Sequence, residues 1–84
     1  MKLNIKALAL AAGILWGAGM FIVGLINMLY PQYGTVFLTV MASIYPGYQP
    51  STEFTSVIIG AIYGFVDAGI GGAIFAWLYN CFVK

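Results

Sequence analysis

The apolar residues of this chain fall into two long runs, separated by a shorter segment rich in tyrosine, proline and glycine. The first run extends from Ala7 to about Tyr30 without a charge, and the second from about Thr55 to Tyr79 with Asp67 as its one charge. A helix of about 24 residues measures roughly 36 Å, enough to cross a hydrocarbon core of about 30 Å. The pattern therefore predicts two transmembrane helices, at about 7–30 and 55–79.

The segment between the two runs is too short to cross a membrane. Pro31 and Gly34 are expected to end the first helix. Residues 35–44 then predict a short amphipathic helix, lying in the interface or against a neighbouring subunit. Its polar strip is Thr35, Thr39, Ala42 and Ser43, and its apolar side is Val36, Phe37, Val40, Met41 and Ile44. Pro46-Gly47 predicts a type II turn, with glycine at the position that needs a positive φ.

These elements predict an all-α integral membrane protein with a single domain, residues 1–84. It is a two-helix transmembrane hairpin with a short interfacial helix in its loop. Ser51 or Thr52 is the expected N-cap of the second long helix, with Glu53 in its first turn. Asn27 is expected to be solvated at the membrane boundary, or else to bond to a neighbouring helix. The loop tyrosines are expected to form an aromatic belt.

Small residues form a stripe on each long helix, which favours close contact between helices. The first stripe is Ala9, Gly13, Gly17, Met20, Gly24 and Asn27, and the second is Gly60, Gly64, Ala68, Gly72 and Ala76. In a hairpin, residues whose numbers sum to about 84 lie at equal depth. The expected pairs are Gly24 with Gly60, Gly17 with Asp67, and Gly13 with Gly71. A further strip on the second helix predicts contacts with other chains, as in a homo-oligomer or larger complex: Ala61, Gly69, Gly72, Ala73 and Ala76.

Asp67 is the one ionisable residue expected near the middle of the membrane, where a carboxyl group is costly. By helical geometry it shares a side of the second helix with Gly60, Gly64 and Gly71, and is expected to face protein. Its expected hydrogen-bond partners are Tyr63 and Trp16. Two roles stay open for it: a hydrogen bond that holds helices together, or a site for protons or cations.

Composition supports the membrane class and excludes several functions. The chain is 63% hydrophobic and 6% charged, with a mean hydropathy of +1.02 and a net charge of +1. It has no histidine or arginine and no basic run, so we expect no metal site, no cofactor and no nucleic-acid partner. No catalytic constellation is present, which predicts a non-enzyme. Cys81 is the single cysteine and forms no internal disulfide.

The lysines predict the topology. Lys2, Lys6 and Lys84 flank the two ends, and the loop has no lysine or arginine. Positive residues concentrate on the cytoplasmic side, so we expect a multi-pass protein of a prokaryotic cytoplasmic membrane with both termini inside. A cleaved signal peptide is the competing interpretation of the first run, but that run exceeds a signal's apolar region of roughly 7 to 15 residues.

Several segments resemble a family of small prokaryotic two-helix membrane proteins that are often labelled "bacteriophage holin". The resemblance is carried by residues 1–8, Trp16-Gly17, residues 42–48, Tyr63-Gly-Phe-Val-Asp67 and residues 71–80. It implies two membrane spans and, by the label, a pore-forming function. The chain also resembles the rotor-ring subunit of ATP synthases, a glycine-rich hairpin with one carboxylate in its second helix. That resemblance implies that Asp67 binds a proton or sodium ion.

The sequence thus supports three hypotheses about function. The first is a structural or assembly protein that self-associates, or packs as an accessory subunit of a membrane complex, through its glycine-rich faces. Its partners are then the lipid bilayer and copies of itself or other membrane subunits. The second is a holin-like pore, and the third is a proton- or cation-binding hairpin.

Overall fold

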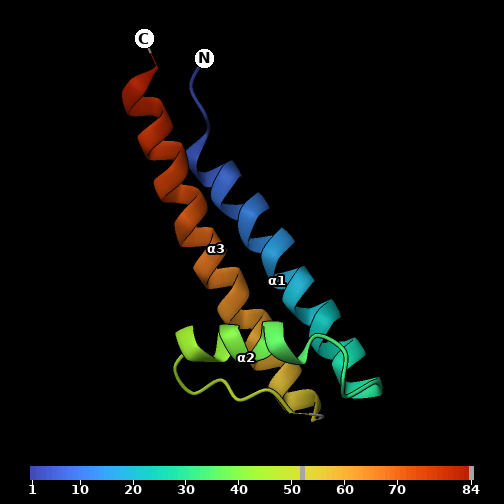
Figure 1. Ribbon diagram of the computed structural model, residues 1–84. Helices are drawn as coiled ribbons and strands as arrows, with labels where there is room; N and C mark the ends of the chain where they lie inside the picture. Colours follow the sequence, from blue (N-terminus) through green and yellow to red (C-terminus); the bar gives the residue numbers. More distant parts are fainter. Residues whose placement is uncertain (52, 84) are drawn as a thin grey trace.

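The computed structural model describes residues 1–51 and 53–83, and it is built from helices joined by turns. Its elements are α1 (Ile5–Leu29), α2 (Thr35–Ile44) and α3 (Phe54–Phe82). The two long helices run antiparallel, so the two ends of the chain meet at one end of the molecule, and α2 lies across the other end (Figure 1). The prediction of an all-helical hairpin with a short loop helix is confirmed.

Both long helices are long and apolar enough to cross a membrane, with mean hydropathies of 2.1 for α1 and 1.8 for α3 over their most apolar windows. α1 begins two residues before its expected start, because the Asn4 side chain accepts a hydrogen bond from the backbone N–H of Ala7 (3.0 Å) and caps it. α3 extends three residues beyond its expected end, to Phe82. The bounds of α2 match the expected range.

The start of α3 differs from the prediction. Its N-cap is Glu53, without a side-chain hydrogen bond to the helix. The Ser51 hydroxyl instead accepts from the backbone N–H of Glu53 (3.2 Å), one step before the helix begins. Serine hydroxyls make such local turns readily, and this one competes with capping. Thr52, the other candidate cap, lies outside the described residues, as does Lys84.

Two glycines with positive φ shape the turns around α2. Gly34 precedes α2 with φ 67°, and an added Cβ there would also lie 2.7 Å from a Val23 methyl group. After α2, the backbone N–H of Tyr48 donates to the Tyr45 carbonyl (3.1 Å), with Pro46 and Gly47 between them and φ 81° at the glycine. These are the features of a type II turn, so that prediction is confirmed.

The arrangement of large and small residues is the reverse of that in a water-soluble protein, whose core holds the large apolar side chains. Between the long helices lie mainly glycine and alanine, while large apolar side chains point outward: Leu15 is 76% exposed and Phe82 81%. Within residues 1–51 and 53–83, a cluster of large buried side chains sits where α2 meets the hairpin. It consists of Met20, Leu38, Tyr45 and Tyr48.

α2 packs on its own hairpin through Leu38, which is 1% exposed. The three hydroxyl residues of its predicted polar strip face outward, and each hydroxyl donates to a backbone carbonyl of the same segment: Thr35 to Pro31 (2.8 Å), Thr39 to Thr35 (2.8 Å) and Ser43 to Val40 (2.6 Å). Ala42, the fourth member of the strip, instead packs partly buried against the core cluster. Three outward residues, Val36, Val40 and Ile44, are apolar. Satisfied hydroxyls beside apolar side chains suit a helix whose outer face meets lipid.

Candidate functional site

The contact between α1 and α3 is built from the small-residue stripes. α1 buries Gly13, Gly17, Met20, Gly24 and Asn27, all members of its predicted stripe. α3 buries Ser56, Val57, Gly60, Gly64, Gly72 and Ala76. Ala68, also of the predicted stripe, is half-buried. The stripes are therefore used within one chain, where they hold the hairpin together.

From the middle of α1 toward the chain ends, the two helices touch backbone to backbone. A Cβ added at Gly13 would lie 2.8 Å from the Phe65 carbonyl oxygen, and one added at Gly17 would lie 3.1 Å from that of Ala61. At Gly72 the nearest atoms would be the Ala12 Cβ at 2.9 Å and the Leu8 carbonyl oxygen at 3.0 Å. Glycine is required here because the partner is backbone, which cannot rotate away. We call these three positions the terminal half of the interface.

Toward α2, the glycines face side chains. An added Cβ would lie 2.9 Å from the Tyr48 ring at Gly60, 2.9 Å from the Met20 Cγ at Gly64, and 3.3 Å from a Val57 methyl group at Gly24. We call Gly24, Gly60 and Gly64 the loop half of the interface. Here each glycine leaves a recess that a larger side chain fills.

The structure corrects the predicted pairs. Gly13 meets Phe65 where Gly71 was expected, Gly17 meets Ala61 and Phe65 where Asp67 was expected, and Gly24 meets Val57 where Gly60 was expected. The residue numbers of the observed pairs sum to between 78 and 82, where about 84 was expected, so the depth register is shifted as well as the rotation of α3. The side of α3 that carries Asp67 is turned toward α2, so a neighbouring edge faces α1.

Two further assignments change for the same reason. Gly71 is exposed, and an added Cβ there would meet nothing within 4 Å, so this glycine is outside the contact with α1. Gly72 and Ala76, which the strip for other chains included, are buried against α1. At these two positions, the strip therefore contacts the same chain and is not available to another chain.

Asp67 belongs to a hydrogen-bonded chain that joins all three helices. The Trp16 indole N–H in α1 donates to the Tyr45 hydroxyl (3.2 Å), at the end of α2. That hydroxyl donates in turn to Asp67 Oδ2 in α3 (2.9 Å). Trp16, an expected partner of Asp67, thus reaches it through Tyr45. Tyr63, the other expected partner, donates instead to the Pro46 carbonyl.

Tyr45 is the residue that the sequence analysis missed, having assigned it to the aromatic belt. Its ring is 3% exposed and stacks on Tyr63, with ring centroids 5.2 Å apart and planes 8° from parallel. The position of Tyr45 in the sequence could have indicated this role. It lies at the end of α2, directly before the Pro46-Gly47 turn that brings the chain back to α3.

Burial raises the pKa of the Tyr45 hydroxyl above its ordinary value of 10.0. The hydrogen bond from Trp16 opposes this change in pKa, and the hydrogen bond to Asp67 and its charge reinforce it. Burial likewise raises the pKa of Tyr48. Tyr45 therefore keeps its proton across the physiological range and remains a donor to the carboxylate.

The Asp67 side chain itself lies on the outer surface of the hairpin. It is exposed, although the prediction was that it faces protein on the glycine side of α3. Among the described residues, the Tyr45 hydroxyl is the group that donates a hydrogen bond to it. Within residues 1–51 and 53–83, no group of three or more His, Cys, Asp or Glu side chains is placed to hold a metal ion.

Two asparagines fix the ends of the hairpin. Asn27 is 5% exposed, and its amide nitrogen lies 3.0 Å from the Pro31 carbonyl, 2.6 Å from that of Tyr33 and 3.3 Å from the Thr35 hydroxyl. The expectation of a solvated Asn27 is wrong, because the turn folds back over it. At the other end, Asn80 accepts from the Leu3 N–H (2.7 Å) and donates to the Leu3 carbonyl (2.9 Å). The sequence analysis missed this second pair.

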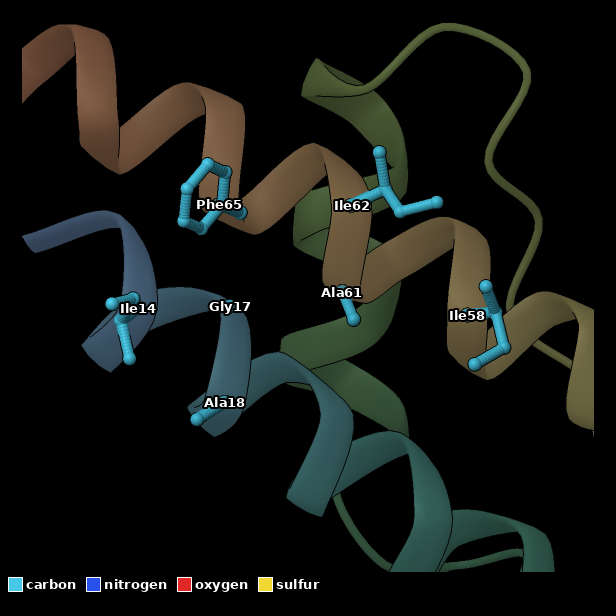
Figure 2. Close-up of a pocket in the computed structure, with 7 residues that line it drawn as sticks. All are labelled: Ile14, Gly17, Ala18, Ile58, Ala61, Ile62 and Phe65. Carbon is cyan, nitrogen blue, oxygen red and sulfur yellow. The ribbon is translucent and has the colours of Figure 1, made fainter. Parts of the chain in front are cut away.

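A shallow apolar groove runs between α1 and α3 on the face opposite α2. In Figure 2, α2 passes behind the two long helices, while the labelled side chains border the groove. Its volume is ≈ 430 Å³, and its floor includes Gly17 and Ala61. The remaining lining residues are Ile14, Ala18, Ile58, Ile62 and Phe65.

Comparison of this chain with protein-family models, with curated proteins and with solved structures finds no match. Its function is therefore argued from its own geometry.

Proposed function

We propose that this protein is a small integral membrane protein that crosses the bilayer twice and serves a structural or assembly role as a subunit of a larger membrane complex. The observation that carries the proposal is the reversed distribution of side chains. Glycines occupy the helix contact, and large apolar side chains cover the outside. In water such a surface would drive aggregation, whereas lipid tails solvate it well.

The hairpin supports a topology with both ends on one side of the membrane. Residues Leu3 and Asn80 are bonded to each other, so the two ends of the chain lie at the same level. Lys2 and Lys6 lie at this end, and the α2 end carries neither lysine nor arginine. By the positive-inside rule, the termini are cytoplasmic and α2 lies on the outer side.

The assembly role rests on what the hairpin leaves uncovered. Since the glycine stripes are buried in the α1–α3 contact, partner subunits meet the outer faces of the long helices. These faces include the groove beside Ala18 and Ala61 and the side of α3 that bears Asp67 and Gly71. Small residues on an outer face allow another helix to approach closely.

Extraction of membranes at alkaline pH tests insertion. An integral hairpin stays in the pellet, and release into the supernatant would contradict the proposal.

Topology is tested with Cys81, which is exposed near the end of α3. A membrane-impermeant maleimide should label Cys81 in inverted vesicles but not in intact spheroplasts. The matched control is Ser51→Cys in a Cys81→Ser background, which should give the opposite result.

Asp67 favours a second candidate function, a proton- or cation-binding hairpin. Its carboxylate is exposed on an apolar helix and accepts a hydrogen bond from Tyr45. A hydrophobic carbodiimide should then label the wild type but not Asp67→Asn. Absence of labelling in the wild type would rule out this second function and leave the assembly role unaffected.

A further inference from the structure

Asp67 lies near the middle of α3 and points to the outside of the hairpin. A carboxylate offers about four acceptor positions. Within the described parts of the chain, one hydrogen bond reaches it, from Tyr45 to Oδ2. In the proposed membrane topology, the rest of this carboxylate faces the hydrocarbon core, where an uncompensated charge is costly.

The chain holds no cation that could compensate this charge. All of its basic side chains are Lys2, Lys6 and Lys84, at the two ends of the sequence. A symmetric pair of copies would bring a second Asp67 to the same depth, which adds repulsion and no compensation. Charge complementarity therefore points to a different protein with a basic residue at mid-membrane.

The surface next to Asp67 has room for such a partner. α2 ends at Ile44 and its C-cap Tyr45 reaches Asp67, so the side of α3 beyond Asp67 toward its C-terminus is not covered by α2. Gly71 lies one turn from Asp67 on this side, and nothing lies within 4 Å of an added Cβ there. Ile70 and Ile74 flank it and are 58% and 52% exposed. An open glycine between exposed isoleucines lets a neighbouring helix approach closely.

We propose that the surface formed by Asp67, Ile70, Gly71 and Ile74 docks a transmembrane helix of another protein that carries a lysine or arginine at mid-membrane depth. The cationic side chain pairs with the open side of the Asp67 carboxylate, while Tyr45 continues to donate to Oδ2. Gly71 receives the backbone of the partner helix. This inference rests on the proposed membrane function and specifies the chemistry of the partner.

The test uses the full chain in phosphatidylcholine vesicles, with a donor dye on Cys81. Two synthetic leucine-alanine helices carry the acceptor dye and differ at their central residue, which is lysine in one and leucine in the other. We expect the lysine helix to associate about tenfold more tightly. Asp67→Asn should remove this preference, and Gly71→Leu should weaken binding of the lysine helix by about tenfold. Gly19→Leu, on α1, where nothing lies within 4 Å of an added Cβ, should leave binding unchanged.

Equal binding of the two helices to the wild type would overturn the inference, and so would a lysine preference that survives Asp67→Asn. In a mixture of donor-labelled and acceptor-labelled copies of this chain, energy transfer that depends on Asp67 would overturn it in favour of a second copy. Circular dichroism of each variant, matching the wild type, shows that the hairpin is retained. Failure of the underlying membrane function is distinguished by release of the wild type at alkaline pH.

Discussion

The two halves of the α1–α3 interface use glycine for different purposes. In the terminal half, Gly13, Gly17 and Gly72 bring backbone against backbone, with carbonyl oxygens facing the glycines. In the loop half, Gly60 and Gly64 accept the ring of Tyr48 and the side chain of Met20. The first arrangement allows no adjustment, while in the second a side chain can move. The same residue type should therefore tolerate substitution very differently along one helix pair.

The largest effect is expected for Gly13→Ala, in the terminal half. The added methyl group meets the Phe65 carbonyl at 2.8 Å, so the helices must separate, at a cost of about 1–3 kcal/mol. Titration with SDS from mixed micelles, followed by circular dichroism, measures the loss. The control is Gly19→Ala, where nothing lies within 4 Å and no loss is expected. Equal loss in both variants would mean that the two helices do not meet at Gly13.

Tyr45→Phe tests the polar contact that accompanies the loop half. It removes the acceptor of Trp16 and the donor to Asp67, with an expected loss of about 1–2 kcal/mol. Amide hydrogen exchange should accelerate in α2 and remain slow in the terminal half of α1. Tyr30→Phe, at an exposed ring, should leave both rates unchanged. Unchanged exchange in α2 of the Tyr45 variant would contradict the role given to this hydroxyl.

Gly60→Ala should cost less than Gly13→Ala, about 1 kcal/mol or below, because the Tyr48 ring can tilt away from the new methyl group. Gly71→Ala, on the open side of α3, should cost nothing. The same SDS titration ranks the variants. If Gly60→Ala destabilised as much as Gly13→Ala, the distinction between the two halves would fail.

The smallest effect is a pH dependence that is confined to the loop half. Burial raises the pKa of Tyr45 and of Tyr48 above 10.0, so the folded state holds these protons more tightly than the unfolded state. Their contribution to stability is complete below about pH 10 and is lost as pH rises through the folded values. In the absorbance of tyrosinate, Tyr45→Phe and Tyr48→Phe should each remove a component that titrates above pH 10. A titration curve that loses no such component in either variant would contradict this.

The sequence predicts the elements well because their signals are local. The length of the apolar runs predicts the two long helices, the change in the pattern of apolar and polar residues predicts α2, and the Pro46-Gly47 pair predicts the turn. The rotation of α3 about its axis could not be obtained, because it depends on where α2 packs. That is why Gly71 was placed against α1, although it is exposed. The bonds of Tyr45 and Asn80 were missed for a similar reason, since each joins residues far apart in sequence.

The most direct test is the accessibility of spin labels placed singly in a Cys81→Ser background in lipid vesicles. Labels at Leu15 and Ile74, which face outward, should collide with oxygen dissolved in the lipid and be shielded from a water-soluble nickel reagent. A label at Ser51, beside the start of α3, should show the reverse. Ready access of nickel to Leu15 and Ile74 would contradict the central claim that glycines join the helices while the large side chains face lipid.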